Sequence, residues 1–98
     1  MEILKEKNGA GLKLALSGRL DTTTAPQLEA ELQACLDTAE ELTLDFAKLD
    51  YISSAGLRVL LAAQKVMGKK GGMKLRNVCA EIMEVFEITG FADILTIA

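Results

Sequence analysis

The sequence predicts an α/β fold, a mixed and mostly parallel β-sheet covered by helices. Short segments that alternate apolar and polar residues, typical of strands, take turns with longer segments rich in Ala and Leu, typical of helices. An Asn-Gly pair between the first two strand segments predicts an N-terminal β-hairpin. Right-handed strand–helix–strand crossovers imply parallel neighbours, so the hairpin adds one antiparallel edge. The expected order of elements is β-β-α-β-α-β-α-β.

The first two strands are expected at Glu2–Lys7 and Leu12–Ser17, joined through Asn8–Gly11. In the second strand three leucines alternate with Lys, Ala and Ser, which predicts one buried face. Asn and Gly both accept positive φ, so the turn is expected at this pair.

The first helix is expected to begin near Pro26, and two starts remain open. Thr24 and Gln27 fit a capping box, or Ala25 caps the helix and Pro26 takes its first position. Four residues fall on one side of this helix: Leu28, Leu32, Cys35 and Leu36. Cys35 is therefore expected in the core rather than in a reactive role.

A third strand is expected at Glu41–Phe46, followed by a loop and a helix over Ala55–Met67. Ser54 is the expected N-cap, because a small hydroxyl side chain there can accept from free backbone N–H groups. Gly56 projects toward the sheet, where the absence of a side chain would let the helix approach closely.

The C-terminal part is expected to hold a strand at Met73–Arg76, a helix at Ala80–Thr89 and a last strand at Ile94–Ile97. Gly90 is the expected C-cap of the helix, with Phe91 folding back onto it. The inward face of this helix is expected to carry Ile82, Val85, Phe86 and Thr89.

Length and composition restrict the function. At 98 residues the chain is expected to form a single domain, residues 1–98. Its net charge of −3 gives no reason to expect direct nucleic-acid binding. There is no histidine, and Cys35 and Cys79 match no metal or redox spacing, so we expect no metal site, no cofactor and no disulfide. Without a signal peptide or long apolar run, we expect a cytoplasmic protein with no membrane insertion.

Enzyme chemistry finds little support. Ser53-Ser54 lies where a serine nucleophile could sit, but the Gly-x-Ser-x-Gly elbow is absent and no histidine can take the proton. A lysine base such as Lys48 stays open, although nothing in the sequence places it near a serine. The segment Gly68–Gly72 lacks the Gly-Lys-Ser/Thr ending of a phosphate-binding loop. We expect no catalytic residues, and we interpret the lysines at 65, 69, 70 and 74 as a solvated face rather than an anion site.

Three motifs in order resemble the STAS domain, and most closely the free-standing bacterial anti-sigma factor antagonists. The segment Ser53–Leu57 resembles the family's Asp-Ser-Ser/Thr-Gly-Leu, with Ser53 in place of Asp and Ala55 in place of the second hydroxyl. Gly18–Asp21 matches the family's Gly-x-Leu-Asp turn, and Phe86–Phe91 is similar to the end of its final helix. The resemblance covers nearly the whole chain and implies the STAS fold.

The resemblance also implies a function. The unmodified antagonist binds an anti-sigma factor that is also a serine kinase and so releases a sigma factor; phosphorylation of Ser54 breaks the complex, and a PP2C-type serine phosphatase reverses it. The implied partner-binding residues are Asp21, Thr22, Thr23, Ser53, Ser54, Ala55, Gly56 and Arg58. Asp21 can equally be a turn residue that bonds its own backbone. We expect a monomer. The alternative is a STAS interaction module of an anion transporter or of another membrane-associated or multiprotein signalling assembly.

Overall fold

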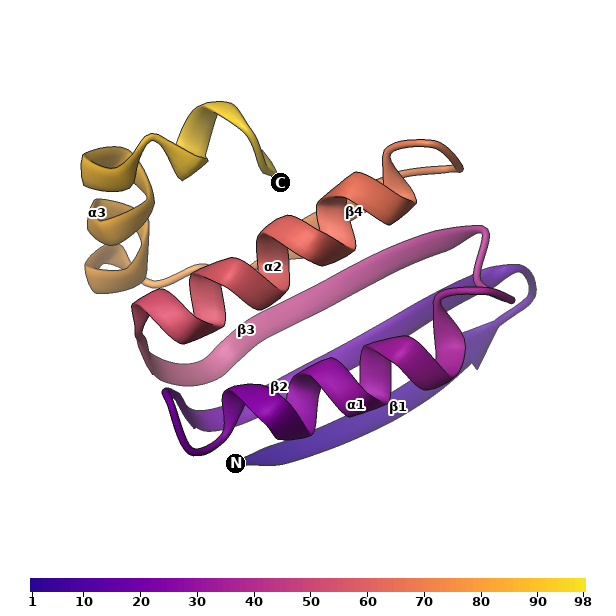
Figure 1. Cartoon of the computed structure of the whole chain (residues 1–98), viewed down its shortest axis with the longest axis horizontal. Coiled ribbons are helices and arrows are strands. Elements are labelled where there is room, and N and C mark those ends of the chain that lie inside the picture. Colours follow the sequence, from indigo (N-terminus) through magenta and orange to yellow (C-terminus); the bar gives the residue numbers. More distant parts are fainter.

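The computed structural model describes residues 1–98 and contains one five-stranded sheet in the order β1-β2-β3-β4-β5 (Figure 1). β1 pairs antiparallel with β2, and the other neighbours are parallel. The strands are β1 (Glu2–Asn8), β2 (Gly11–Leu20), β3 (Glu41–Ile52), β4 (Met73–Arg76) and β5 (Thr96–Ile97). The helices are α1 (Ala25–Cys35), α2 (Ser54–Met67), α3 (Ala80–Thr89) and the short 3₁₀ helix η1 (Phe91–Asp93). The predicted mixed α/β fold is confirmed, and none of the helices is long and apolar enough to cross a membrane.

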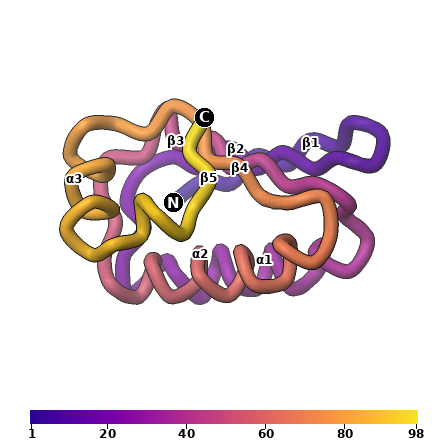
Figure 2. The backbone as a smooth tube through the Cα atoms, turned by 90° about the horizontal axis from the view of Figure 1, so that it is seen from above, coloured from indigo at the N-terminus to yellow at the C-terminus, as the bar shows by residue number.

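The helices lie unevenly about the sheet. α1 and α2 lie side by side on one face, α3 lies at one end, and the opposite face carries no helix (Figure 2). One cluster of 24 buried apolar residues fills the space between the layers. Its fully buried members come from the sheet and from all three helices, among them Leu14, Phe46, Leu28, Leu60 and Phe86. Burying one such side chain contributes roughly 1.5–3 kcal/mol, so this layer holds the helices on the sheet.

β3 is twice as long as predicted, because the expected loop after Phe46 continues the strand to Ile52. The pairing with β2 shifts twice along this stretch, and the buried residues Phe46, Leu49 and Ile52 are three positions apart rather than two. Asp45 Oδ1 accepts from the Ala47 N–H at 3.0 Å, within the first irregular stretch. Such bulges break the period-two pattern by which a strand is recognised, which is why the prediction stopped early.

The hairpin turn lies one residue later than predicted. Asn8 pairs with Gly11, so Gly9 and Ala10 are the two central residues, and Gly9 has φ +66°. Asn8 remains in the strand. A glycine at the first central position is what a type II′ turn requires, whereas the prediction had counted on Asn and Gly together.

The start of α1 differs from both predicted versions. Thr24 is the N-cap, but its side chain makes no capping hydrogen bond and Pro26 is the second helical residue. The Gln27 side chain donates instead to the Met1 carbonyl at 3.0 Å, so the predicted capping box is wrong. The other end of the helix matches better: Cys35 is buried as predicted, and Leu36 is half-buried.

α3 ends as predicted, and its inward face is narrower than predicted. Gly90 is the C-cap in the left-handed region at φ +84°, and the half-buried Phe91 packs against the core. Thr89 is exposed rather than inward, and its hydroxyl donates to the Val85 carbonyl at 2.7 Å. The last strand is shorter than predicted, because η1 occupies Phe91–Asp93 and Ile94 is 48% exposed.

Lys70 is exposed, as predicted, and its ammonium group also bonds to the end of α1. Its Nζ donates to the carbonyls of Leu36, Asp37 and Ala39 at 2.5, 3.1 and 3.2 Å. Carbonyls at the end of a helix lack intrahelical partners, and a lysine there satisfies them. Lys70 therefore ties the end of α1 to the turn after α2.

Candidate partner-binding site

Two of the motifs singled out in the sequence meet at one edge of the sheet. Arg19 pairs with Tyr51 and Leu20 with Ile52 at the carboxyl ends of the parallel strands β2 and β3. The Ser53 N–H then donates to the Leu20 carbonyl at 2.9 Å. This register places the Asp21 turn beside the start of α2. We call this edge, with the first turns of α1 and α2, the tip.

The two adjacent serines differ in accessibility. α2 begins at Ser54, so Ser53 is its N-cap, and the prediction that Ser54 caps the helix is wrong. The Ser53 side chain makes no capping hydrogen bond, and its Oγ is buried without any hydrogen-bond partner. Ser54 is exposed at the first helical position. Only the Ser54 hydroxyl is therefore open to another protein.

Gly56 sets how closely α2 approaches the sheet. A Cβ at this position would lie 2.7 Å from Leu20 Cγ and 2.9 Å from Ile52 Cγ1, closer than side-chain atoms normally approach. The prediction that Gly56 faces the sheet is confirmed. Its missing side chain brings the first turn of α2, and Ser54 with it, against the ends of β2 and β3.

Asp21 organises the turn between β2 and α1. Its Oδ1 accepts from the Thr23 hydroxyl at 2.8 Å and from the backbone N–H groups of Thr23 and Thr24 at 3.0 and 3.1 Å. These bonds, the hydroxyl first, hold the pKa of Asp21 below its ordinary value. The turn interpretation of Asp21 is confirmed, while its contact with a partner stays a prediction.

Three of the predicted partner-binding residues line one pocket. Thr22, Ala55 and Arg58 face a pocket of about 220 Å³ between the starts of α1 and α2, with Pro26 and Glu29 on the α1 side. Arg58 is exposed and takes part in none of the three ion pairs of the chain, which join Lys5 to Glu31, Lys13 to Asp45 and Arg19 to Asp21. The tip thus carries a free guanidinium one helical turn from Ser54.

The structure adds two residues that the sequence analysis did not select. The Arg19 guanidinium lies 4.1 Å from the centroid of the Tyr51 ring, and Arg19 Nε lies 3.7 Å from Asp21 Oδ2. Arg19 stood at the variable position of the Gly-x-Leu-Asp motif, and Tyr51 stood in an expected loop. Their pairing depends on the bulges of β3, which leave no clear sequence signal.

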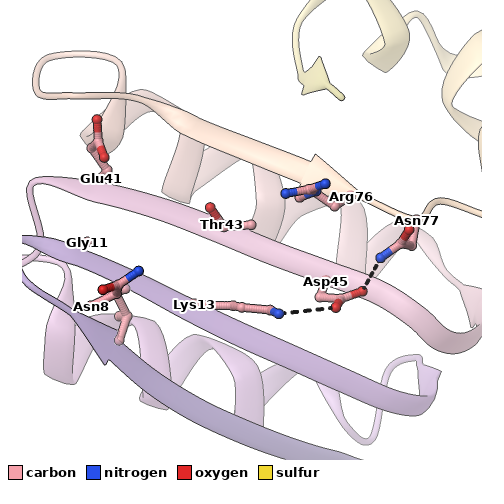
Figure 3. Close-up of a pocket in the computed structure, with 9 residues that line it drawn as sticks. Asn8, Gly11, Lys13, Glu41, Thr43, Asp45, Arg76 and Asn77 are labelled. Atoms are coloured by element: carbon pink, nitrogen blue, oxygen red, sulfur yellow. Dashed lines mark hydrogen bonds and ion pairs between the residues drawn. The ribbon is translucent and has the colours of Figure 1, made fainter.

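A larger hollow lies away from the tip, on the face of the sheet without helices (Figure 3). It has a volume of about 440 Å³ and contains none of the predicted site residues. Asp45 accepts there from Asn77 Nδ2 at 3.0 Å and lies 3.7 Å from Lys13 Nζ, which together with the Ala47 N–H lowers the pKa of Asp45. These contacts fasten the bulge of β3 to the end of β4. No group of three or more His, Cys, Asp or Glu side chains gathers anywhere in the structure.

Comparison with known proteins identifies the family. The family model described as "Mlab, STAS domain" matches residues 3–96. The chain belongs to the STAS domain family. The predicted STAS fold is confirmed, and the tip of this STAS domain is formed by two of the three motifs that carried the resemblance, Gly18–Asp21 and Ser53–Leu57.

Relatives of this STAS domain match nearly its whole length. A protein of Bordetella bronchiseptica named as an anti-sigma factor antagonist, BtrV, is 42% identical over 100 residues, which is 100% of this chain and 86% of BtrV. The anti-sigma-B factor antagonist of Bacillus subtilis is 29% identical over 94 residues, 95% of this chain and 86% of the relative.

Solved structures agree on the fold. An anti-sigma factor antagonist from Mycobacterium paratuberculosis superposes with a TM-score of 0.89 at 25% identity, over 98% of this chain and 83% of the other. Unphosphorylated SpoIIAA, also an anti-sigma factor antagonist, superposes with a TM-score of 0.78 at 17% identity, over 99% of this chain and 87% of the other. At that identity the second comparison supports the fold alone.

Proposed function

We propose that this STAS domain is an anti-sigma factor antagonist whose tip binds an anti-sigma factor that is also a serine kinase. The observation that carries the proposal is the exposed Ser54 hydroxyl at the first position of α2, beside a Ser53 hydroxyl that is buried. Full-length relatives at 42% and 29% identity are named antagonists, which supports the same function. Binding releases a sigma factor, phosphorylation of Ser54 ends the complex, and a PP2C-type serine phosphatase restores the active form.

The proposed contact surface combines the two motifs of the tip. It consists of Asp21, Thr22, Thr23, Ser53, Ser54, Ala55, Gly56 and Arg58. Thr22, Ala55 and Arg58 supply the pocket, and Asp21 and Thr23 supply a rigid turn at its rim. Gly56 and Ser53 are inner residues that hold the surface in place, Gly56 by its lack of a side chain and Ser53 by its backbone N–H bond to the Leu20 carbonyl.

A phosphate on Ser54 would act locally. It adds a charge of roughly −1.5 to −2 near neutral pH. The start of a helix tolerates an anion, because free backbone N–H groups and the helix dipole both favour negative charge there. The domain therefore keeps its fold, while the phosphate has to be desolvated in the complex and repels partner carboxylates. The switch is electrostatic and needs no change of structure.

The chain acts by binding rather than by catalysis in this proposal. No histidine is present to activate Ser54. Lys48, the lysine considered above as a possible base, is an exposed residue of β3. The same proposal assigns the protein to the cytoplasm as a monomeric domain of residues 1–98 with no cofactor, no nucleic-acid contact and no membrane insertion.

The alternative function is that of an interaction module, because the matching family model describes a STAS domain and names no antagonist. In that case the tip would dock onto another protein of a transporter or membrane-associated assembly and would not be phosphorylated. The relatives that match over the whole chain at 42%, 29% and 27% identity are named antagonists, so we prefer the first function.

The test is a reaction between the purified protein and the anti-sigma factor from the same organism. Wild-type protein, Ser54→Ala and Ser53→Ala are each titrated with this anti-sigma factor, and each is incubated with it and ATP before peptide mass spectrometry. We expect all three to bind, and we expect phosphate on Ser54 of the wild type and of Ser53→Ala, with none on Ser54→Ala. The phosphorylated wild type should bind at least a hundredfold more weakly, with unchanged circular dichroism.

Two results would contradict the proposal. Phosphate on Ser53 alone would show that the wrong hydroxyl was chosen. Undiminished binding by the phosphorylated protein would remove the switch. A Ser54→Asp variant adds less charge than phosphate and a different shape, so we expect it to weaken binding without reproducing the full effect.

A further inference from the structure

We propose that the stacked pair Arg19–Tyr51 is the anchor by which the tip holds its partner, with Arg19 receiving a carboxylate and Tyr51 an apolar side chain. This inference rests on the proposed function, because its occupant is the anti-sigma factor. It extends the contact surface from the helix side of the tip onto the ends of β2 and β3, and neither residue belongs to the surface described above.

The exposure of Tyr51 is the first observation. The chain has four aromatic residues, three Phe and one Tyr. Phe46 and Phe86 are fully buried and Phe91 is half-buried, whereas Tyr51 is 40% exposed, two residues before the N-cap of α2. A protein with so few aromatic residues loses burial energy by leaving one in water. Tyr and Arg are the residue types that most often dominate the energy of protein–protein interfaces, together with Trp.

The pair is already ordered in the free protein. Arg19 and Tyr51 are direct neighbours across β2 and β3, and the guanidinium lies 4.1 Å from the ring centroid. Asp21 Oδ2 holds the guanidinium from one side at 3.7 Å from Nε, and hydrogen bonds from Thr23 and Thr24 fix Asp21 in turn. Two long side chains that are held before binding lose less entropy when the partner arrives.

The chemistry of the occupant follows from what the pair leaves free. Asp21 approaches Arg19 only at Nε and at a distance longer than a hydrogen bond, so the two terminal nitrogens keep their donors for a carboxylate, which a guanidinium can bind in a bidentate manner. The Arg19 side chain is 60% exposed, which leaves room for this approach. Arg58, one helical turn after Ser54, is also exposed and takes part in no ion pair. The partner segment is therefore acidic, with an apolar residue beside its carboxylate.

Tyr51 lies three residues before Ser54, so their Cα atoms are at most about 11 Å apart and the pair is within reach of a partner centred on Ser54. An ordinary interface buries about 800 Å² per partner, which corresponds to a patch reaching roughly 16 Å from its centre. Val66 is equally 40% exposed but lies twelve residues along α2, about 18 Å from Ser54 at 1.5 Å per residue. Val66 and Lys69 near it are thus matched controls outside the patch.

The experiment is a titration of the anti-sigma factor from the same organism with single variants, at two salt concentrations. We expect Arg19→Glu and Tyr51→Ala each to weaken binding at least tenfold, Tyr51→Phe to stay within threefold because it keeps the ring, and the controls Lys69→Glu and Val66→Ala to stay within twofold. The loss in the double variant Arg19→Glu/Tyr51→Ala should be smaller than the product of the two single losses, because each residue holds the other. In the phosphorylation reaction, Arg19→Glu and Tyr51→Ala should raise the KM for this STAS domain as the substrate and leave kcat unchanged.

The outcomes separate the two proposals. If the wild type does not bind the anti-sigma factor, the proposed function falls and the anchor with it. If the wild type binds and is phosphorylated on Ser54 while Arg19→Glu and Tyr51→Ala bind within twofold of it, the anchor alone is overturned. If Lys69→Glu weakened binding as much as Arg19→Glu does, the anchor would also be overturned, since the loss would then arise from the change in net charge. Circular dichroism and urea midpoints of every variant exclude losses that arise from unfolding.

Discussion

Ser53 and Thr24 carry hydroxyl groups in opposite situations. Ser53 Oγ is buried without a partner, whereas Thr24 Oγ1 donates to the Arg19 carbonyl at 2.7 Å and accepts from the Asp21 N–H at 2.8 Å. We expect Ser53→Ala to raise the free energy of unfolding by about 1 kcal/mol and Thr24→Val to lower it by about 1–3 kcal/mol. Urea unfolding of both variants checks the signs. A loss of stability in Ser53→Ala would mean that its hydroxyl is satisfied after all.

Gly56 gives the second prediction for a single residue. Gly56→Val should destabilise the domain by more than Gly56→Ala, which should itself cost about 1–3 kcal/mol, because the new Cβ meets Leu20 and Ile52. Alanine favours a helix by about 1 kcal/mol over glycine, so a stabilised Gly56→Ala would show that α2 can retreat from the sheet. Ser54→Ala, which removes an exposed hydroxyl without a capping bond, should change the stability by less than about 0.5 kcal/mol.

Sequence alone was sufficient for Gly56 and insufficient for its neighbours. The inward position of Gly56 follows from helical periodicity, which is insensitive to an error of one residue at the helix end. The choice of cap between Ser53 and Ser54 depends on that one residue, and it was wrong for this reason. The Asp21 turn was predictable because its hydrogen bonds are local, while the Arg19–Tyr51 pair joins residues that only the strand register brings together.

Lys70 connects two elements, the end of α1 and the turn after α2. We expect Lys70→Met to lower the free energy of unfolding by about 0.5–1.5 kcal/mol, because it removes a charged but solvent-exposed donor from three carbonyls. Lys69→Met, at the neighbouring exposed lysine, is the control and should be nearly neutral. Hydrogen exchange should quicken in the last turn of α1 in the first variant only. Equal exchange in both variants would mean that the contact contributes nothing measurable.

The bulge of β3 predicts a dependence on pH. Hydrogen bonds from Asn77 and the Ala47 N–H, with Lys13 nearby, lower the pKa of Asp45 from its ordinary value of 3.8. A carboxyl whose pKa is lower in the folded state binds its proton less readily there. Its contribution to the free energy of unfolding is therefore complete above the ordinary pKa and is lost as the pH falls through the pKa of the folded state. Wild-type stability should therefore fall below about pH 4. Asp45→Asn should be less stable at neutral pH and should lose less on acidification; equal pH profiles would contradict this.

The elements themselves were predictable where their patterns are regular. β4, α3 and the left-handed Gly90 follow from local periodicity and a glycine at the right place. β3 was cut short because its bulges change the spacing of buried residues, and the last strand was drawn too long because η1 follows Gly90 directly. In both cases a tertiary feature overrode the local pattern.

At the scale of the whole molecule, the order of elements and the rule of right-handed crossovers were enough to predict a mixed sheet with one antiparallel edge. They could not predict which face of the sheet stays without helices. Alternating apolar and polar residues show that a strand has one buried face, but they do not show where each helix packs. The polar hollow of Figure 3 lies on that face, and its residues come from β1 to β4 and the segment after β4. No single stretch of sequence announces it.

One continuous core predicts one unfolding transition. The 24 buried residues form a single cluster that includes all three helices and the central strands, so no element has a core of its own. Tyr51 is the only tyrosine and there is no tryptophan, so its fluorescence reports the tip alone, while far-UV circular dichroism reports the helices. We expect both signals to give the same urea midpoint.

Protein carrying phosphoserine at position 54, installed during translation, should also show coincident signals. Its free energy of unfolding should differ from that of the unmodified protein by no more than about 1 kcal/mol, because an anion is tolerated at the start of α2. A tyrosine signal that changes at lower urea than the ellipticity would show that the tip unfolds separately, and a phosphorylated protein with reduced ellipticity would mean that the switch acts through the fold rather than through the surface.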